Sequence, residues 1–419
     1  MKKKLAVAQV SKADAVGGGA SAVAELLYDG LPEHGVRTMH YCLYADKGFD
    51  FRRRPIGGHR NMMILEQNLA FKNDRHLGMG EVVPLEAPFF ESEQETFGFD
   101  LFHFHDLSSA VSPLTLLKVA RSLPVVWTMH DCSPITGGCL YPLGCTQWRD
   151  EAGCQSCPQH GQWPLDTAVD TAWINHEIRR RLHAATGLHL VSPSHWLAQE
   201  AMSSPIVTRE VTVIPNGIDP APFEALDPAG IRAAMDIAPD AAVLCFVSGD
   251  LRDERKNISH ALAAVRAAGD RDPKVIAIGK MSDEVAEELQ GIDLITPGYV
   301  TDRRAMAKYL AASDVLVFTS LAENHPLTVL EAMAAATAVF GYATGGVPEQ
   351  VEDGRSGRLV PTADRDALKK LFADLPDRSR LVEMGAEARA RFEARFTVDQ
   401  MLAAYRRFYE SVLAEHSEA

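Results

Sequence analysis

The chain has 419 residues, of which 46% are hydrophobic, 23% charged and 7% aromatic. This composition excludes a fibrous or disordered protein, and the length favours two folded domains. The net charge of −14 repels polyanions, so we expect no nucleic-acid partner. No stretch approaches the ~18 consecutive apolar residues of a membrane span, and no signal-peptide pattern is present, which predicts a cytoplasmic protein.

Short apolar runs alternate with amphipathic stretches, and this pattern predicts parallel sheets built from βαβ units. Because the pattern occurs twice, we expect an α/β protein with two Rossmann-like domains. In the first half the expected strands are 5–10, 38–43, 101–105, 125–130 and 188–191, with helices at 20–32 and 113–123. In the second half the expected strands are 243–248, 275–279, 294–297, 315–319 and 338–341, followed by helices over 363–415.

A cluster of proline, glycine and asparagine at 214–220 marks the junction between the two halves. We therefore expect an N-terminal domain over 1–214, a C-terminal domain over 215–395 and a terminal helix within 396–419. An irregular insertion rich in glycine and cysteine, 131–160, interrupts the first domain.

The segment 320–333 follows an expected strand and opens an expected helix. The free amides and positive dipole end of such a helix N-terminus can bind a phosphate. We expect Asn324 to cap this helix, with Pro326 in its first turn and the amides near Leu327 and Thr328 open to a ligand.

Two acidic residues of this segment, Glu323 and Glu331, are eight positions apart, which at helical rise separates them by ~12 Å. A glycosidase carboxylate pair needs about 5–9.5 Å, so this spacing excludes a hydrolase dyad. It suits two acceptors that bind hydroxyls at opposite ends of a ligand whose diphosphate lies between them. On spacing alone, two ordinary solvated acids remain the alternative.

These residues resemble the E-x7-E signature of retaining GT-B glycosyltransferases of family 4. Other segments match that family in its own order, namely 17–19, 127–131, 191–194, 213–219, 298–300, 312–315, 326–334 and 345–357. The resemblance covers nearly the whole chain. It implies the GT-B fold, with two Rossmann-like domains facing across a cleft and the C-terminal helix returning to the first domain.

The resemblance also implies that the second domain holds a nucleoside-diphosphate sugar. Glu323 would hydrogen-bond the transferred sugar, Glu331 the ribose hydroxyls, and Lys256 would face the donor phosphates. The arginine usual in the family shortly before this lysine is missing, so Arg252 or Arg255 would take its place. The other donor-binding residues implied in this domain are Asn324, His325, Leu327 and Thr328.

Residues of the first domain complete the implied site. Gly18 and Gly19 would allow the backbone to approach the donor, because they carry no side chain. A plain tight turn is the alternative reading of these glycines. His130, at the end of an expected strand, would face the transferred sugar, and a structural histidine is the alternative.

The implied activity is transfer of a sugar with retention of configuration and without a catalytic metal or other cofactor. The donor would be a nucleoside-diphosphate sugar, with a slight preference for uridine over guanosine. The acceptor would be lipid-linked or an oligosaccharide, in bacterial surface-polysaccharide biosynthesis. Two alternatives remain: a sugar-nucleotide epimerase on the same fold, and a non-catalytic protein that binds a sugar nucleotide or a partner.

Four cysteines, Cys139, Cys145, Cys154 and Cys157, follow the spacing C-x5-C-x8-C-x2-C. This pattern is typical of a structural zinc site, because zinc prefers four thiolate or imidazole ligands. A reducing compartment disfavours disulfides. We expect structural zinc, with free or paired thiols as the alternative.

Two arginine triplets, 52–54 and 179–181, raise the hypothesis of peripheral contact with the inner face of an anionic membrane. Solvated basic faces are the alternative.

Overall fold

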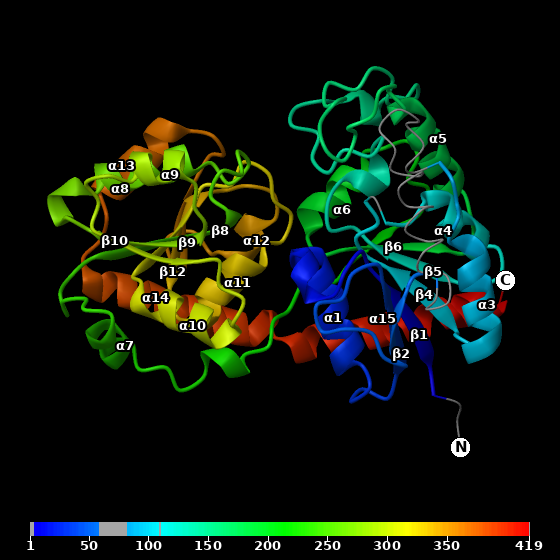
Figure 1. The fold of residues 1–419 in the computed structure, drawn as a ribbon, viewed down its shortest axis with the longest axis horizontal. Coiled ribbons are helices and arrows are strands. Elements are labelled where there is room, and N and C mark those ends of the chain that lie inside the picture. The colour runs from blue at the N-terminus through cyan, green and yellow to red at the C-terminus, as the bar shows by residue number, and fades with distance from the viewer. Residues whose placement is uncertain (1–3, 58–81, 109, 419) are drawn as a thin grey trace. The chain divides into compact units, whose positions relative to one another are not determined.

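The computed structural model describes residues 4–57, 82–108 and 110–418, and the chain divides into two compact units. Unit 1 comprises residues up to Pro215 together with Met401–Ala419, and unit 2 comprises Asn216–Gln400. Each unit contains one parallel sheet with helices on both faces (Figure 1). The predicted α/β fold of two Rossmann-like domains is therefore confirmed.

Unit 1 is built on a seven-stranded sheet of order β3-β2-β1-β4-β5-β6-β7. Its strands are β1 (Ala6–Val10), β2 (Arg37–Cys42), β3 (Arg53–Pro55), β4 (Leu101–Phe104), β5 (Val125–Thr128), β6 (Leu188–Ser192) and β7 (Val211–Val213). Its helices are α1 (Gly19–Gly30), α3 (Ala87–Phe97), α4 (Pro113–Val119), α5 (Ala172–His183), α6 (His195–Met202) and most of α15 (Val398–Glu418). The strands β1, β4 and β5 are buried along their whole length, as parallel strands covered on both faces require.

Unit 2 is built on a six-stranded sheet of order β10-β9-β8-β11-β12-β13. Its strands are β8 (Val243–Asp250), β9 (Lys274–Lys280), β10 (Leu294–Gly298), β11 (Val315–Phe318), β12 (Ala338–Tyr342) and β13 (Gly357–Val360). Its helices are α7 (Pro228–Ala234), α8 (Ile258–Ala267), α9 (Asp283–Glu288), α10 (Arg303–Ala312), α11 (Leu327–Ala334), α12 (Val347–Gln350), α13 (Arg365–Ala373) and α14 (Arg378–Arg395).

Two apolar clusters cover the faces of the unit 2 sheet. Side chains of α10, α11 and α14 form one cluster, which includes Leu310, Val329 and Phe392. Side chains of α8 and α13 form the other, which includes Leu262 and Phe372. Figure 1 shows these two helix layers on opposite sides of the strands. Because helices pack on both faces, the strands are fixed in the unit, and so are the starting points of the loops that follow them.

The C-terminal helix α15 belongs to unit 1 from Met401 onward. Its Tyr405 and Tyr409 are at most 1% exposed. Tyr405 Oη lies 2.9 Å from Thr128 Oγ1 of β5, and Tyr409 Oη lies 2.7 Å from His103 Nδ1 of β4. These bonds attach the last helix to the centre of the first sheet.

Candidate functional site

The order of strands in unit 2 reverses between β8 and β11, and ligands of open α/β sheets bind at such a switch point, beyond the carboxyl ends of the strands. The loop after β8 carries Lys256, and the loop after β11 carries Glu323. Two hydrogen bonds tie these loops together: Leu321 N donates to Arg255 O at 2.7 Å, and the side-chain hydroxyl Thr319 Oγ1 donates to Lys256 O at 2.9 Å. The topology therefore brings the two predicted residues to one place.

Lys256 and Glu323 contact each other directly. Lys256 Nζ lies 2.5 Å from Glu323 Oε1, and the side chains are 27% and 14% exposed. The pair is partly shielded from water, so its attraction is stronger than that of a surface pair. Without a ligand, these two groups satisfy each other's charge.

Helix α11 begins at Leu327, and its N-cap is Pro326, which makes no side-chain capping bond. The expectation that Asn324 caps this helix is wrong. The reason is that the chain is still in a buried loop at Asn324, which is 2% exposed. The N-cap residue itself satisfies none of the first amides of α11, which is compatible with the predicted contact of an anion at Leu327 and Thr328.

The loop before α11 is held by hydrogen bonds to its carbonyl groups. Gly346 N donates to Asn324 O at 2.8 Å, and Asn216 Nδ2 donates to His325 O at 3.0 Å. Gln350 Nε2 lies 3.2 Å from His325 Nδ1, and burial lowers the pKa of His325 to about 3. Asn324 and His325 therefore shape the loop from inside the unit, and their buried side chains do not form an open ligand surface.

A pocket with about 440 Å³ of empty space, partly open to solvent, lies beside this helix start. Its lining includes the polar side chains of Ser248, Lys256, Ser320 and Thr328, and the apolar side chains of Phe246 and Leu316. The predicted residues Lys256 and Thr328 thus share one concave surface. Ser248 and Ser320 were not predicted, because an isolated serine after a strand carries no distinguishing signal.

Glu331 lies on α11, about one turn beyond the helix start, and its side chain is half-buried. Burial raises its pKa to about 7, while the positive charge of Arg303 at the start of α10 lowers it. A carboxyl that has lost part of its hydration gains most from a ligand that donates hydrogen bonds to it. This environment is compatible with the predicted contact to ribose hydroxyls.

The two arginines considered as substitutes for the missing arginine both form local ion pairs. Arg252 contacts Asp250 at 2.7 Å and Arg255 contacts Asp253 at 2.8 Å, with the arginine side chains 64% and 44% exposed. Leu251, between β8 and these residues, is 1% exposed. Because each arginine pairs with a nearby aspartate, these contacts favour neither of them as the residue that would bind the donor phosphate.

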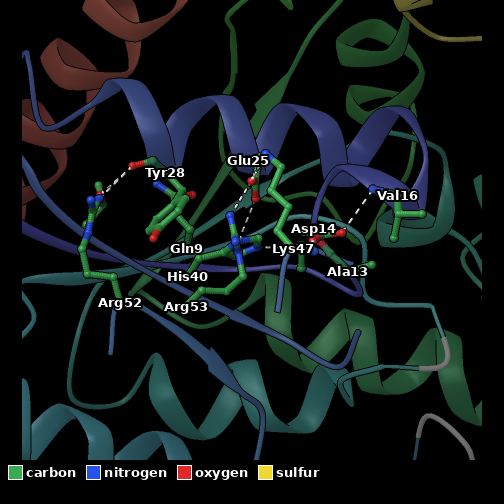
Figure 2. A network of polar contacts seen from close by, with 12 residues as sticks. Gln9, Ala13, Asp14, Val16, Glu25, Tyr28, His40, Lys47, Arg52 and Arg53 are labelled. Carbon is green, nitrogen blue, oxygen red and sulfur yellow. Dashed lines mark hydrogen bonds and ion pairs between the residues drawn. The ribbon is translucent and has the colours of Figure 1, made fainter. Parts of the chain in front are cut away.

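In unit 1, the glycine loop lies at the end of β1. Asp14 Oδ1 accepts from Val16 N at 3.3 Å and Asp14 Oδ2 from Lys47 N at 3.0 Å, which fixes the turn before Gly18 (Figure 2). Gly18 has a φ of +98°, a conformation that favours glycine. Gly19 has ordinary backbone angles, and a Cβ placed on it would meet no atom within 4 Å. The fold itself therefore does not require glycine at position 19.

A buried ionic network anchors helix α1 behind this loop. Figure 2 shows Glu25 pointing from α1 toward His40, Lys47 and Arg53. Glu25 is 4% exposed; it pairs with Arg53 and with Lys47 at 2.9 Å. Hydrogen bonds and charges of these partners outweigh burial and lower the pKa of Glu25 to about 2. The network fixes the helix that begins at Gly19.

Each arginine triplet is partly buried, so the alternative of two fully solvated basic faces is not what the structure has. Arg53 is 6% exposed and pairs with Glu25, and Arg54 Nε lies 3.0 Å from Glu93. Arg179 is 1% exposed and its Nε donates to Ser133 O at 2.5 Å. The physical reason is that a guanidinium can be buried where carboxylates or carbonyls satisfy its donors. Arg180 and Arg181 are 33% and 69% exposed, and the hypothesis of membrane contact stays a prediction.

His130 follows β5 and is half-buried. Its Nε2 lies 3.0 Å from Nδ1 of His105, which follows β4. Burial lowers the pKa of His130 to about 3 and raises that of the adjacent Asp131 to about 6. His130 is therefore a neutral imidazole at the carboxyl edge of the sheet, the edge on which the glycine loop also lies.

The four cysteines of the insertion line one small, partly open cavity, together with Trp148. Gly137 N donates to Cys154 Sγ at 3.2 Å, and burial raises the pKa of Cys139 to about 12. Within residues 4–57, 82–108 and 110–418, no three histidine, cysteine or acidic side chains are already gathered as metal ligands. The four thiols thus lie around one space.

Comparison with known proteins shows the family. Residues 17–222 match the description Glycosyltransferase Family 4, and residues 241–376 match Glycosyl transferases group 1. The D-inositol 3-phosphate glycosyltransferase of Kribbella flavida is 31% identical over 345 residues, which are 78% of this chain and 75% of that protein. The chain is a family 4 glycosyltransferase. The predicted family is confirmed, and with it the GT-B fold class.

One further relative of this glycosyltransferase and one protein of similar fold are informative. The colanic acid biosynthesis glycosyl transferase WcaC of Escherichia coli K12 is 28% identical over 333 residues, 76% of this chain and 78% of WcaC. The Anabaena protein Alr3699/HepE, solved with UDP and glucose, has a TM-score of 0.66 at 17% identity and covers 97% of this chain and 100% of its own. Along the part of the glycosyltransferase that the structure describes, every helix is too short or too polar to span a bilayer.

Three residues of this glycosyltransferase that shape the sites were missed by sequence reasoning. Asp14 fixes the glycine loop, Arg303 faces Glu331, and His105 contacts His130. Two signals were available: an aspartate three residues before a glycine run, and two histidines, 103 and 105, in an otherwise apolar strand. The sequence does not indicate that Arg303 acts on Glu331, because the two residues are 28 positions apart.

Proposed function

We propose that this glycosyltransferase transfers a sugar, with retention of configuration, from a UDP-sugar to a lipid-linked or oligosaccharide acceptor in surface-polysaccharide biosynthesis. The main observation in support of this donor site is that Lys256 and Glu323 contact each other near the start of α11, at the switch point of unit 2. The N-cap residue of α11 makes no side-chain capping bond. Uridine is supported by the structural similarity to HepE bound to UDP, and the acceptor class by the similarity to WcaC.

The transition state explains why these groups are needed. Breaking the bond between the anomeric carbon and the donor oxygen develops positive charge on the sugar ring and negative charge on the departing diphosphate. The amides at Leu327 and Thr328 and the ammonium of Lys256 provide fixed positive potential for that diphosphate. We propose that this potential takes the place of a catalytic divalent cation.

Donor binding is proposed to separate the Lys256–Glu323 pair. The diphosphate attracts Lys256 Nζ, and Glu323 then accepts hydrogen bonds from the transferred sugar. Both charges exchange one partner for another within a partly shielded pocket, so neither is left without a counterpart. Glu331 accepts from the ribose, and the diphosphate lies between the two glutamates. The acceptor hydroxyl enters on the face that the diphosphate leaves, and the leaving phosphate takes its proton.

The test is sugar transfer from a panel of UDP- and GDP-sugars, with Lys256→Ala and Glu323→Ala compared with Lys274→Ala. Lys274 is a matched control, because it forms an ion pair with Asp293 at 3.2 Å at the opposite end of the same sheet. We expect each site variant to lose at least ~10³-fold in kcat, as loss of an electrostatic stabiliser does, while unfolding temperature and the control activity stay near wild type. Near-normal turnover in both site variants would refute the assignment.

The same panel of donor sugars distinguishes transfer from the two alternative functions, epimerisation and binding without catalysis. An epimerase would convert the donor with no acceptor present, and a non-catalytic binding protein would bind the donor and release it unchanged. The family match and the intact set of Lys256, Glu323 and Glu331 favour transfer. Turnover that persists in a chelator would support the proposed role of the helix and lysine in place of a metal.

We further propose that Cys139, Cys145, Cys154 and Cys157 hold a structural zinc ion. The four thiols line one cavity, and Gly137 N already donates to one sulfur. Bound zinc would keep the thiols deprotonated and link the loops of the insertion, which contains few apolar side chains of its own.

Elemental analysis of purified protein tests this proposal. We expect about one zinc per chain in wild type and in Cys245→Ala, whose sulfur is buried in the unit 2 core, and loss of zinc in Cys157→Ser. Well under one zinc per wild-type chain, or full zinc content in Cys157→Ser, would contradict it.

A further inference from the structure

A basic cavity lies at the amino edge of the unit 1 sheet. It has a volume of about 300 Å³ and is open to solvent. In the part of the chain that the structure describes, it is lined by Lys4, Pro32, Val36, Arg37, Thr38 and Arg52. Three of these side chains are cationic and none is acidic, although the whole chain has a net charge of −14. The cavity therefore gathers positive charge on an acidic protein.

The cavity and the glycine loop lie at opposite edges of the sheet. Lys4 precedes β1, Arg37 begins β2, and Arg52 immediately precedes β3. Because these strands are parallel neighbours, their amino ends lie at one edge. Figure 2 shows the same separation along α1, with Arg52 and Tyr28 near one end of the helix and the Asp14 turn near the other. The cavity is therefore distinct from the part of unit 1 that was predicted to meet the donor.

Buried groups hold the guanidinium of Arg52 in place. Thr38, which is 3% exposed, donates from Oγ1 to Tyr28 O at 2.8 Å and accepts from Arg52 Nη2 at 3.3 Å. The guanidinium carbon of Arg52 lies 4.7 Å from the centre of the Tyr28 ring. These contacts orient the positive charge before any ligand binds, which reduces the entropy lost on binding.

Arg37 is held in a similar way. Its Nη2 donates to Phe97 O at 2.6 Å, and its guanidinium carbon lies 5.6 Å from the centre of the Phe99 ring. Carbonyls, a hydroxyl and aromatic rings orient the two guanidinium groups, but none of these partners carries a formal negative charge. Among the described residues, neither arginine forms an ion pair, and the contacts use only one terminal nitrogen of each. Since a guanidinium has five N–H donors, both groups keep donors and charge for a ligand.

The carboxylates nearest to Arg52 do not line the cavity. Asp50 Oδ1 accepts from the backbone amides of Arg52 and Arg53, at 2.7 and 2.6 Å. Asp29 belongs to the ionic network behind α1, since its pKa, which burial raises, responds to the charges of Glu25 and Lys47 as well as to that of Arg52. Both carboxylates therefore have other neighbours, and the positive charge of the cavity is left for a ligand.

The number and kind of the cations favour one class of anion. A phosphate monoester carries nearly two negative charges and three acceptor oxygens, and arginine binds such a group through two parallel hydrogen bonds. A carboxylate has one charge and two oxygens, so it matches two guanidinium groups and an ammonium less well. A volume of about 300 Å³ also reaches the lower end of small-ligand sites, about 300–1,000 Å³.

We propose that this cavity binds a phosphate monoester group, at a site separate from the donor diphosphate. Arg37 and Arg52 bind the phosphate oxygens, and Lys4 adds the third charge at the rim. Two kinds of molecule present this chemistry, namely an anionic lipid with its headgroup and a soluble phosphorylated compound. The proposal does not rest on the proposed function.

Two binding measurements on the full-length protein test the proposal. One is calorimetry with glycerol 3-phosphate, and the other is sedimentation with vesicles of phosphatidic acid in phosphatidylcholine, compared with phosphatidylcholine alone. We expect wild type to bind at least one probe, and the dissociation constant to rise at least ~tenfold in the double variant Arg37→Gln/Arg52→Gln. A loss confined to the vesicles identifies a lipid headgroup, and a loss confined to glycerol 3-phosphate identifies a soluble ligand.

Two control variants show where the probe binds. Arg209→Gln removes an exposed cation just before β7, at the far side of the same sheet, and should bind as wild type does. Lys256→Ala alters the proposed donor site and should also leave binding unchanged. An equal loss in Arg209→Gln would indicate attraction to net charge alone, and a loss in Lys256→Ala without one in the double variant would place the probe at the donor site. Either result would overturn the proposal.

The proposal also fails if wild type binds neither probe, or if the double variant binds both as tightly as wild type does. If the double variant has a lowered unfolding temperature or does not fold, Lys4→Gln replaces it, because Lys4 is exposed. We then expect at least a threefold rise in the dissociation constant, and an unchanged value would overturn the proposal.

Discussion

Replacing Glu331 by glutamine should stabilise the unliganded protein more at pH 8 than at pH 5. Burial raises the pKa of Glu331 to about 7 from an ordinary value of 4.5. An acid with a raised folded-state pKa favours folding when protonated, so its destabilising effect grows as the pH rises from 4.5 to 7. At about 1.4 kcal/mol per pH unit, the ionised group destabilises the fold by up to about 3 kcal/mol at pH 8.

The magnitude to expect is smaller, because the side chain is only half-buried. At pH 5 the same group still destabilises the fold by about 1 kcal/mol, since the unfolded chain is already mostly ionised there. The stabilisation by Glu331→Gln should therefore be about 2 kcal/mol greater at pH 8 than at pH 5, after water screening has reduced the effect. For a unit of this size, that corresponds to about 4–8 °C in unfolding temperature.

Thermal unfolding of wild type, Glu331→Gln and Glu287→Gln at both pH values measures this difference. Glu287 is an exposed glutamate of the same unit and serves as the control. Any pH-independent effect of the amide cancels in the comparison. UDP binding should strengthen from pH 6 to pH 8 in wild type and stay flat in Glu331→Gln, because the ribose requires the ionised form as acceptor. Equal stabilisation at pH 5 and pH 8 would refute the reasoning.

Three further variants give separate outcomes. Gly19→Ala should leave stability unchanged or raise it by about 0.4–1 kcal/mol, yet lower turnover at least tenfold. Gly17→Ala should instead destabilise the protein, because its Cβ would lie 2.4 Å from Ser21 Oγ. Glu25→Gln should lower the free energy of unfolding by about 2–4 kcal/mol at pH 7 in urea, and less toward pH 2, where the wild-type carboxylate itself is protonated. Zinc chelation should lower the unfolding temperature of wild type more than that of Cys157→Ser.

The fold was predictable from sequence to the extent that apolar periodicity determines it. Each expected strand is present, with ends within two residues of those observed. The strands β3, β7 and β13 were missed, because they are short edge or near-edge strands. In β3 the residues are Arg53, Arg54 and Pro55, a composition that reads as a solvated basic segment. Only the distant Glu25 and Glu93 make burial of those arginines possible.

The donor site was predictable in its residues but not in its internal contacts. The resemblance pointed to Lys256, and spacing with the resemblance to Glu323; the structure adds that their side chains contact each other. The cap at Asn324 was assigned wrongly, because local propensity favours asparagine there while three long-range hydrogen bonds to its backbone carbonyls keep the segment in a loop. The hydrogen bonds that attach α15 to β5 and β4 lay beyond sequence reasoning, since they join residues 277 and 306 positions apart.

The central claim is that the start of α11 and Lys256 hold the diphosphate of the donor, and a crystal structure with UDP tests it most directly. The account predicts diphosphate oxygens within about 2.7–3.2 Å of the amides at Leu327 and Thr328 and of Lys256 Nζ, with the Lys256–Glu323 contact opened. UDP bound elsewhere in unit 2, or bound here with that contact unchanged and the helix amides unused, would contradict it.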